Sequence, residues 1–370
     1  MISGSAEGSL WTCRVPRAVT RRSRSFDVPG QGRPKPGIRG GGSLPTRPIR
    51  TKLVAMTTPD ATTPSTVPQT LTGYVTLLGR PNAGKSTLMN RFVGQHLSIV
   101  TARAQTTWQR VTGILTVGDA QLVFLDTPGL LEARDLLQRA MLGAALEALH
   151  EADVVLLVVD VAQRPRARDT GRLEHALADA RAPVHVALNK ADLADSATLE
   201  AWDAWARSVD AGVTHRVSAL TGTGVQALLD ALVTELPPGP FLYPKDDVAS
   251  EPVRFFVAEL VRETVFERYT QEVPYSVFCR VEEFRESEDP LYVLVHVYVE
   301  RPSQKAILIG AGGQAIRDLG QAARAKIEHF LGRRVYLDLW VKSSRSWRKN
   351  RARLGELGFR VPEDDEARRA

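Results

Sequence analysis

The chain reads Gly79-Arg80-Pro81-Asn82-Ala83-Gly84-Lys85-Ser86 directly after an apolar run at residues 74–78, and a helix-forming run follows at residues 87–92. This G-x-x-x-x-G-K-S spacing between a strand and a helix is that of a phosphate-binding loop. The glycines let backbone N–H groups point at phosphate oxygens, and the following helix offers its positive end to the same anion. We therefore expect residues 79–87, through Thr87, to bind nucleotide phosphates, with Lys85 on the outer phosphates and Ser86 on Mg²⁺.

Short apolar runs alternate with helical stretches throughout residues 71–236. This alternation predicts an α/β domain with a mostly parallel sheet that helices cover on both faces. Ligands of such sheets bind at the carboxyl ends of the strands. The predicted strands span residues 74–78, 111–117, 121–125, 154–160, 183–188 and 212–217.

Three further motifs each follow a predicted strand. In Asp126-Thr127-Pro128-Gly129, the aspartate can hold Mg²⁺ through a water and the Gly129 N–H can sense a γ-phosphate. In Asn189-Lys190-Ala191-Asp192, the final carboxylate can accept hydrogen bonds from N1–H and N2–H₂ of guanine, a donor pair that adenine lacks. In Ser218-Ala219-Leu220, a backbone N–H can meet the guanine O6. Each motif alone is weak, but their order at successive strand ends indicates a GTP site.

Together with Gln105-Thr106-Thr107, these motifs resemble the Era-like family of translation-factor-related GTPases. The resemblance implies an Mg²⁺-dependent enzyme that converts GTP to GDP and phosphate, with switch segments at residues 105–107 and 126–130. It also implies that one threonine of the Thr106-Thr107 pair ligates Mg²⁺. We favour Thr107, beside Ser86 and Asp126, as the third metal ligand. Trp108 stands where Era-like proteins usually carry arginine.

Leu130 occupies the place where many switch GTPases carry the glutamine that orients the attacking water. A leucine side chain cannot hydrogen-bond to water, so hydrolysis must be organised in another way. Asn82 matches an asparagine that holds K⁺ in related GTPases, and the resemblance therefore implies K⁺ as a further cofactor. The alternative is that Asn82 only shapes the loop.

Residues 251–350 predict a second, α+β domain. A helix is followed by strands at 275–283 and 291–299, a second helix, the turn Gly310-Ala311-Gly312-Gly313, a third helix and a strand at 334–341. This order resembles a type II KH domain, whose glycine turn clamps an RNA backbone. A plain glycine-rich turn between helices is the alternative. The expected RNA-binding residues are the turn itself with Lys305, Arg317 and Arg324.

Charge is segregated in this second domain. Residues 301–353 contain thirteen Arg or Lys and three acids, whereas residues 241–300 contain thirteen acids and six bases. A basic half that carries the glycine turn is what binding to a phosphate backbone requires. Trp340 and Trp347 could stack on bases, although packing within their own domain is the commoner role of such tryptophans.

By resemblance, the RNA is the 3′ region of 16S ribosomal RNA and the role is assembly of the small (30S) ribosomal subunit. The resemblance places the protein in the cytoplasm and also allows a peripheral association with the inner face of the cell membrane. No obligate protein partner can be read from the sequence. Two alternatives stay open: a GTP-regulated RNA-binding switch with another RNA target, and a membrane-associated regulatory GTPase.

Composition adds few constraints. The chain has 370 residues and two cysteines, Cys13 and Cys279, which give no disulfide framework and indicate a reducing compartment. No apolar run approaches the roughly 18 residues that a membrane-spanning helix needs. Residues 1–55 hold eleven of the basic residues and only two acids. The excess of bases over acids in this segment is larger than the net charge of +6 of the whole chain, so the net charge does not indicate nucleic-acid binding.

Residues 1–70 are rich in Arg, Gly, Pro, Ser and Thr without periodicity, so we expect a disordered extension. It reads as a transit peptide, a basic nucleic-acid-binding tail or an over-extended gene start, and we favour the last, with initiation at Met56. The predicted organisation continues with a GTPase domain at 71–236, a proline-rich linker at 237–250, the KH domain at 251–350 and a tail at 351–370.

We predict that residues 1–55 are absent from the native protein, because composition changes abruptly near Met56. The intact mass of the protein purified from its own source should correspond to a start at or near Met56. A mass that includes Met1, or cleavage at a transit-peptide site, would contradict the prediction.

Overall fold

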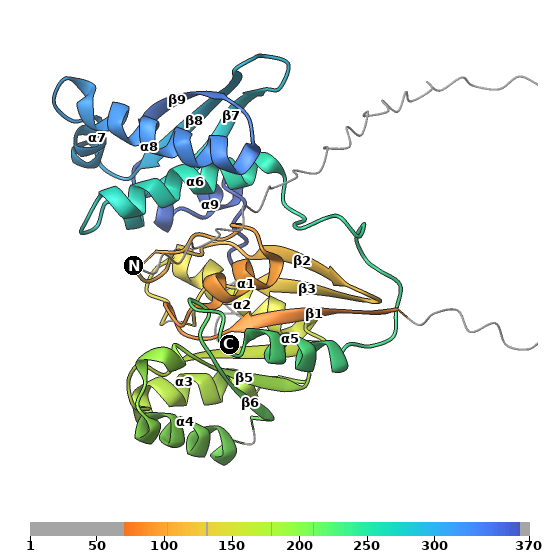
Figure 1. The fold of residues 1–370 in the computed structure, drawn as a ribbon. Helices are drawn as coiled ribbons and strands as arrows, with labels where there is room; N and C mark the ends of the chain where they lie inside the picture. The colour runs from red at the N-terminus through yellow and green to blue at the C-terminus, as the bar shows by residue number, and fades with distance from the viewer. Residues whose placement is uncertain (1–69, 102, 131, 179, 210, 363–370) are drawn as a thin grey trace, which may run out of the picture. The chain divides into compact units, whose positions relative to one another are not determined.

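The computed structural model describes residues 70–362 apart from 102, 131, 179 and 210, so the predictions for residues 1–69 lie outside the described part. Six strands form the first sheet: β1 (Leu71–Leu78), β2 (Val111–Val117), β3 (Ala120–Asp126), β4 (Val154–Asp160), β5 (Val184–Asn189) and β6 (Val213–Val217). Their order is β2-β3-β1-β4-β5-β6 (Figure 1). Only β2 and β3 pair antiparallel, so the mostly parallel sheet is confirmed.

Helices cover both faces of this sheet. The helices of one face are α1 (Lys85–Val93) and α5 (Val225–Thr234), and those of the other are α2 (Leu136–Glu151), α3 (Ala167–Ala178) and α4 (Ser196–Ser208). Alternate residues of β4 enter the two cores: Val154, Leu156 and Val158 pack with α1 and α5, and Val155, Leu157 and Val159 pack with the other helices. A strand that is buried on both faces must be apolar at every position, which explains this continuous run.

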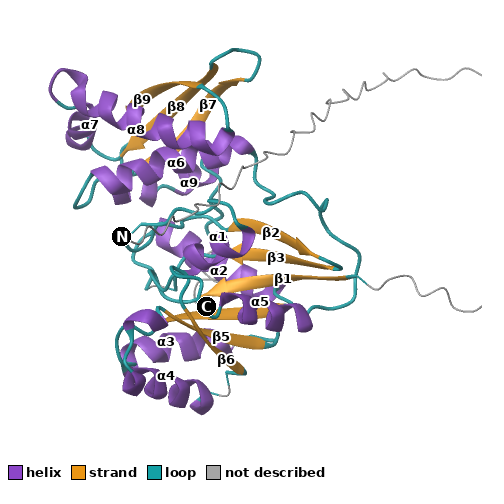
Figure 2. Cartoon of the chain, viewed as in Figure 1, coloured by secondary structure: helices purple, strands orange, loops and turns teal. Residues whose placement is uncertain are grey.

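A second, three-stranded sheet has the order β7-β8-β9 and consists of β7 (Phe278–Arg285), β8 (Leu291–Val299) and β9 (Val335–Ser343). Around it lie α6 (Val253–Arg268), α7 (Pro302–Ile309) and α8 (Gln314–Leu331) (Figure 2). Alternate residues of β8, from Leu291 to Val299, are buried against α6 and α8. The predicted element order is therefore confirmed.

One predicted boundary in this region is wrong. The strand expected at 275–283 begins at Phe278, because Pro274–Ser276 form a 3₁₀ turn that the Ser276 N–H closes onto the Val273 carbonyl. The strand continues to Arg285, with a register shift between Val281 and Glu283.

The predicted linker is tied to the first sheet. Thr72 N–H donates to the Pro237 carbonyl at 3.0 Å, and Pro238 forms an isolated bridge with Leu71. Farther on, the Ile114 N–H of the edge strand β2 donates to the Val248 carbonyl at 2.9 Å. An edge strand has unpaired backbone groups, and the contact with Val248 satisfies one of them. The segment that composition marks as a spacer thus lies along the sheet.

The predicted tail also contains ordered structure. Helix α9 (Arg351–Glu356) begins at residue 351, and its Leu354 is buried in an apolar cluster with Trp108 and Trp347. Trp347 is fully buried and donates its indole N–H to the Ser276 carbonyl, so this side chain cannot stack on a base. Trp340, in contrast, is 56% exposed. None of the described helices combines the length and apolar character that a membrane span needs.

Candidate nucleotide site and nucleic-acid interface

The phosphate-binding loop joins β1 to α1. Gly84 has a left-handed φ of 95°, and a Cβ there would lie 2.2 Å from Nδ2 of Asn189, so only glycine fits. The buried Lys85 ammonium donates to the carbonyls of Gly79 at 3.2 Å and Arg80 at 3.1 Å. Burial lowers the pKa of Lys85 to about 8, although the Asp126 carboxylate opposes this shift.

Three oxygen-bearing side chains from three segments meet beside this loop. Ser86 Oγ donates to Asp126 Oδ2 at 2.7 Å and lies 3.0 Å from Thr107 Oγ1, which in turn lies 3.3 Å from Asp126 Oδ2. Burial raises the pKa of Asp126, while Lys85 and the neighbouring hydroxyls oppose the rise. Among the described residues, Asp126 Oδ1 is buried without a hydrogen-bond partner. Hard oxygen donors and an unsatisfied carboxylate oxygen fit Mg²⁺, which favours the charged carboxylate.

Of the two adjacent threonines, Thr107 reaches this oxygen set. Thr106 Oγ1 turns away and donates to the Ile99 carbonyl at 3.4 Å. Gln105 adopts a left-handed φ of 63°, and its carbonyl accepts the Trp108 indole N–H at 2.9 Å. Trp108 is buried and thus anchors the segment that carries Thr107.

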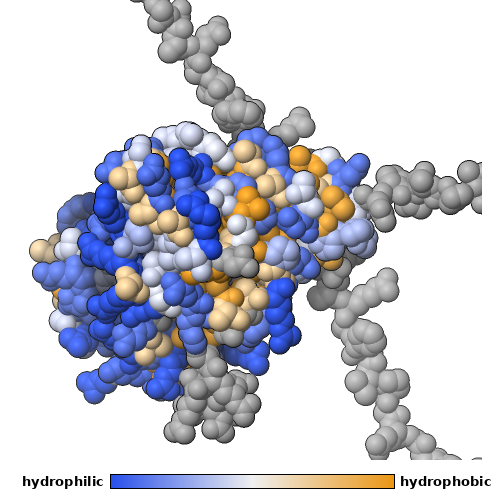
Figure 3. All heavy atoms as spheres, turned by 90° about the horizontal axis from the view of Figure 1, so that it is seen from below, coloured by the Kyte–Doolittle hydropathy of each residue, from blue (hydrophilic) through white to orange (hydrophobic). Residues whose placement is uncertain are grey.

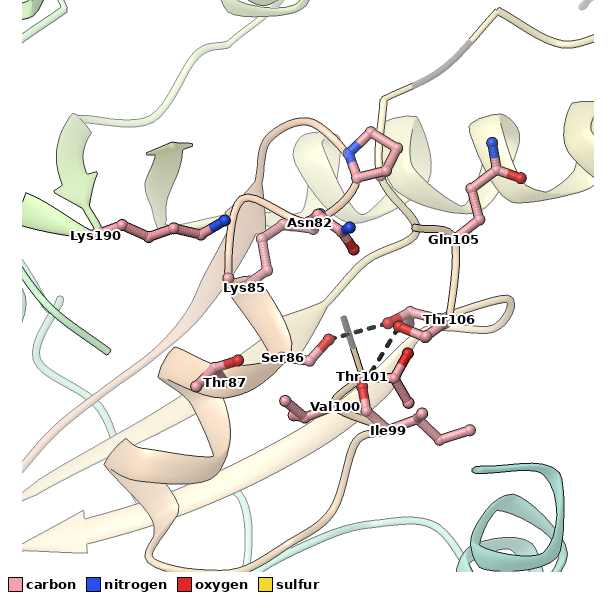
Figure 4. Close-up of a pocket in the computed structure, with 14 residues that line it drawn as sticks. Asn82, Lys85, Ser86, Thr87, Ile99, Val100, Thr101, Gln105, Thr106 and Lys190 are labelled. Carbon is pink, nitrogen blue, oxygen red and sulfur yellow. Dashed lines mark hydrogen bonds between the residues drawn. The ribbon is translucent and has the colours of Figure 1, made fainter. Parts of the chain in front are cut away.

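Figure 4 shows the pocket that these segments enclose. Residues 81, 82 and 84–87 line it together with residues 99–101 and 105–107, Gly129 and Lys190. Arg80 is not among the lining residues; its guanidinium pairs with Asp169 at 2.9 Å, so the predicted contribution of Arg80 falls to its backbone.

The Asp126–Gly129 motif is tied to the phosphate loop. Thr127 Oγ1 donates to the Leu77 carbonyl at 2.7 Å, and the Leu130 N–H donates to the Gly79 carbonyl at 3.0 Å. Pro128 lies between them in the same turn and is buried. The Leu130 side chain packs in the apolar core with Leu78 and therefore faces away from the pocket.

The candidate guanine site forms at the carboxyl ends of β5 and β6. Asn189 is buried and links two loops, because its Nδ2 donates to the Ala83 carbonyl and its Oδ1 accepts the Ala219 N–H, both at 2.8 Å. Ser218 Oγ caps the same loop by accepting the Thr221 N–H at 3.1 Å. Asp192 lies exposed in the 3₁₀ turn Ala191–Leu193, and Leu220 is 76% exposed.

Two contributors to this region were missed in the sequence. Asp160 lies at the end of β4, and its Oδ2 forms an ion pair with Lys190 Nζ at 2.5 Å. Its position at a carboxyl strand end is a signal that could have identified it. Arg91 donates to the carbonyls of Ala219 and Leu220 and so supports the base loop. No local pattern predicts this contact, because 128 residues separate Arg91 from Ala219.

The glycine turn joins α7 to α8. Gly310 has a φ of 71°, and a Cβ there would lie 2.6 Å from the Ala315 Cβ, so glycine is required for the close approach of the two helices. Ala311 and Gly312 are exposed, and a Cβ at Gly312 would meet nothing within 4 Å. The open backbone of this turn is therefore accessible to a ligand.

Basic side chains lie on the two helices that the turn joins. Arg317 and Arg324 are exposed on α8, and Lys305 is half-buried on α7. The Arg317 guanidinium lies close to the turn, 3.2 Å from where a Cβ on Gly313 would be. The structure thus brings the predicted glycines and Arg317 together.

Comparisons with known proteins agree with both parts of the chain. The family described as 50S ribosome-binding GTPase matches residues 74–190, and the KH domain family matches residues 272–348. The chain is 40% identical to GTPase Era of Carboxydothermus hydrogenoformans over 293 residues, which cover 78% of this chain and 97% of the relative. It is 42% identical to GTPase Era of Mesorhizobium japonicum over 297 residues, which cover 80% and 96%.

Two solved structures share this architecture. One is an Era variant of Aquifex aeolicus bound to GDP and AlF4⁻, and the other is Era in complex with MgGDPNP and nucleotides 1506–1542 of 16S ribosomal RNA. Each is 34% identical to this chain with a TM-score of 0.74, and each alignment covers 78% of this chain and 99% of the other.

The position of Asp192 predicts a change of base preference. In Asp192→Asn the amide can pair with the 2-oxo group of xanthine but cannot accept both guanine donors. GTP binding should weaken by roughly 1.5–3 kcal/mol, as for a lost charged hydrogen bond, while xanthosine triphosphate binding strengthens. Titration of both nucleotides measures this change. The control is Asp195→Asn, the same type of substitution at the N-cap of α4. Asparagine also caps helices well, so this change should have little effect. Unchanged GTP affinity in Asp192→Asn would contradict the assignment.

Proposed function

This chain belongs to the Era family of GTPases, and from that premise we propose that it binds 16S ribosomal RNA through its KH region and acts in assembly of the small ribosomal subunit. The observation that carries the proposal is the glycine turn, open to a ligand and with Arg317 beside it, on the same chain as the GTP site. We place this activity in the cytoplasm. Peripheral association with the inner face of the cell membrane is a further part of the proposal.

GTP hydrolysis is assigned to residues around the phosphate loop. Lys85 compensates the charge of the outer phosphates, the loop amides hold the phosphate oxygens, and the Gly129 N–H is available to the γ-phosphate. Mg²⁺ would neutralise phosphate charge, and we assign Ser86 and Thr107 as the residues that would ligate it and Asp126 as the residue that would hold it through a water. Lys85 and Ser86 begin α1 and Asp126 ends β3, so regular elements hold the site.

We include K⁺ as a cofactor of hydrolysis. Leu130 is packed in the core and cannot position water, so another group must stabilise the charge that develops. Asn82 lines the nucleotide pocket and is the residue that the family resemblance connects with a monovalent cation.

Hydrolysis should therefore be faster in K⁺ than in Na⁺, and replacing Asn82 should remove the difference. Asn82 has a left-handed φ of 62°, so Asn82→Gly deletes the side chain without backbone strain and Asn82→Ala adds that strain. Turnover of both variants in matched K⁺ and Na⁺ buffers is the measurement. Equal turnover of the unmodified protein in the two salts, with full activity of Asn82→Gly, would exclude this role.

The RNA assignment predicts a selective effect at the turn. Gly312→Asp places a carboxylate where a phosphate must approach, so RNA binding should be lost while basal GTP hydrolysis stays unchanged. Gly312→Asn is the matched control, because asparagine has nearly the same size, tolerates the φ of 57° and carries no charge. Filter binding with an RNA equivalent to nucleotides 1506–1542 tests both variants. Normal binding by Gly312→Asp would refute the assignment.

We further propose that the nucleotide state controls RNA affinity through α6. Arg262, on that helix, is 1% exposed, and its Nη2 donates to the Thr106 carbonyl and to Glu259, both at 2.5 Å. Its guanidinium also lies 4.7 Å from the centroid of the Trp108 ring. Because Thr106 precedes the candidate metal ligand Thr107, rearrangement of the switch segment must disturb a buried arginine.

The neighbouring residue Glu263 continues this connection. It accepts His96 Nε2 at 2.9 Å and the Val100 N–H at 3.2 Å, and it accepts the Lys326 ammonium of α8 at 2.8 Å. Although burial opposes it, hydrogen bonds from His96 and Lys326 hold the pKa of Glu263 below its usual value. Lys326 lies on α8, which begins at the glycine turn, so hydrogen bonds through α6 connect residues 96–107 with the helix that carries Arg317 and Arg324.

GTP should accordingly raise RNA affinity through the basic face around Arg317 and Arg324, by roughly 5–150-fold as is typical of allosteric coupling. Arg262→Lys keeps the charge but loses the planar fork, so the ratio of RNA affinities with a non-hydrolysable GTP analogue and with GDP should fall towards one. Arg254→Lys, at an exposed position on the same helix, should keep the ratio.

RNA titrations in both nucleotide states, at one salt concentration, measure this ratio, and thermal unfolding checks that each variant is folded. Linkage requires RNA to tighten GTP binding by the same factor. Identical RNA affinities in the two states of the unmodified protein would mean that the chain carries two independent modules.

A further inference from the structure

A hollow lined by arginines adjoins the nucleotide pocket. Arg80 of the phosphate loop lines it together with Arg166, Arg168 and Arg172, which lie just before and within α3. An adjoining hollow shares three of these arginines and adds Arg134, from the segment after the Asp126–Gly129 motif. We call these five arginines the arginine groove. Figure 3, seen from the side where α3 and α4 lie, shows a mostly hydrophilic surface there.

The groove is distinct from the nucleotide pocket in its charged residues. None of the five arginines lines that pocket, and the two sites share only Pro81 and Gln105 at their border. The Arg80 guanidinium pairs with Asp169 on α3, and Arg80 is not among the residues that line the nucleotide pocket. Its charge therefore lies in the groove, where Asp169 pairs with it.

The groove contains more arginines than carboxylates. Arg80 pairs with Asp169, and Arg172 lies 3.4 Å from Glu132. Among the described residues, these two carboxylates are the only acids that line either hollow. Arg166 and Arg168 are exposed and make no ion pair with any described residue. Because exposed ion pairs are worth only about 0–1 kcal/mol, a phosphate can replace the carboxylates without a large cost.

The arrangement favours a chain of phosphates over a single anion. Each guanidinium can bind a phosphate through a planar pair of N–H groups, and five of them line one continuous depression. A flat bilayer surface would fit a concave site poorly, and Leu130, the one leucine among the lining residues, is buried. A nucleic-acid backbone has the spacing and flexibility to place successive phosphates along such a depression.

We propose that the arginine groove is a second RNA-binding site, which holds the backbone of an RNA segment other than the one at the glycine turn. This inference rests on the proposed function, since it assumes that ribosomal RNA is the ligand of the chain. Gln105 and Leu130, at the edges of both switch segments, are among the residues that line the groove.

The test compares a short RNA, equivalent to nucleotides 1506–1542 of 16S ribosomal RNA, with full-length 16S ribosomal RNA. The groove variant is Arg166→Glu with Arg168→Glu, because neither residue belongs to the nucleotide site. The control is Arg181→Glu with Arg207→Glu, which makes the same charge change at exposed positions of the same domain outside the groove. Arg166→Gln with Arg168→Gln removes the charges without adding carboxylates.

The groove variant should bind full-length RNA at least about tenfold more weakly. The slope of log affinity against log salt concentration should fall by about 1.4 to 1.8, since each lost phosphate contact removes about 0.7 to 0.9. The glutamine pair should lower this slope similarly. Binding of the short RNA, basal GTP hydrolysis and the control variant should stay close to the unmodified protein.

Unchanged binding of full-length RNA by the groove variant would overturn the inference, and so would an equal loss in the control, which would indicate diffuse attraction alone. Loss of binding to phosphatidylglycerol vesicles without loss of RNA binding would assign the groove to membranes instead. If the unmodified protein fails to bind the short RNA, the proposed role of the glycine turn fails. The inference about the groove then depends only on whether the groove variant binds full-length RNA more weakly.

Discussion

The buried carboxylate of Asp126 is the group on which the rest of the structure depends. It lies fully buried at the end of a central strand, where an uncompensated charge would be very costly. Lys85 supplies the compensating charge, and Ser86 and Thr107 supply hydrogen bonds. These partners come from the phosphate loop helix and the switch segment, so one electrostatic requirement draws three separate parts of the chain together.

The order of the strands makes this convergence possible. Because β1 lies between β3 and β4, the phosphate loop emerges beside both Asp126 and Asp160. Asn189, one strand farther on, then links the phosphate loop with the loop after β6 through one amide. Apolar packing on both faces of the sheet holds these strand ends rigidly, which a site that must organise a triphosphate requires.

Helix α6 makes the switch segment dependent on the second sheet. Arg262 faces the segment that carries Thr107, and the next residue, Glu263, contacts His96 and Val100. Both side chains are buried and therefore need polar partners. Arg262 finds these partners in Glu259 and Thr106, and Glu263 finds them in His96 and Lys326. A change in the switch segment therefore alters the environment of buried charged side chains on α6.

The sequence by itself determined the element order, the mostly parallel sheet and the places of the nucleotide motifs and the glycine turn, because apolar periodicity, glycine turns and motif spacing are local properties. Only the tertiary structure decided that Thr107 meets Asp126, that Arg80 turns to α3, that Trp347 is buried and that residues 237–248 pair with the sheet. Each of these depends on which distant segments pack together. A side chain's burial and partners follow from that packing, which no local pattern encodes.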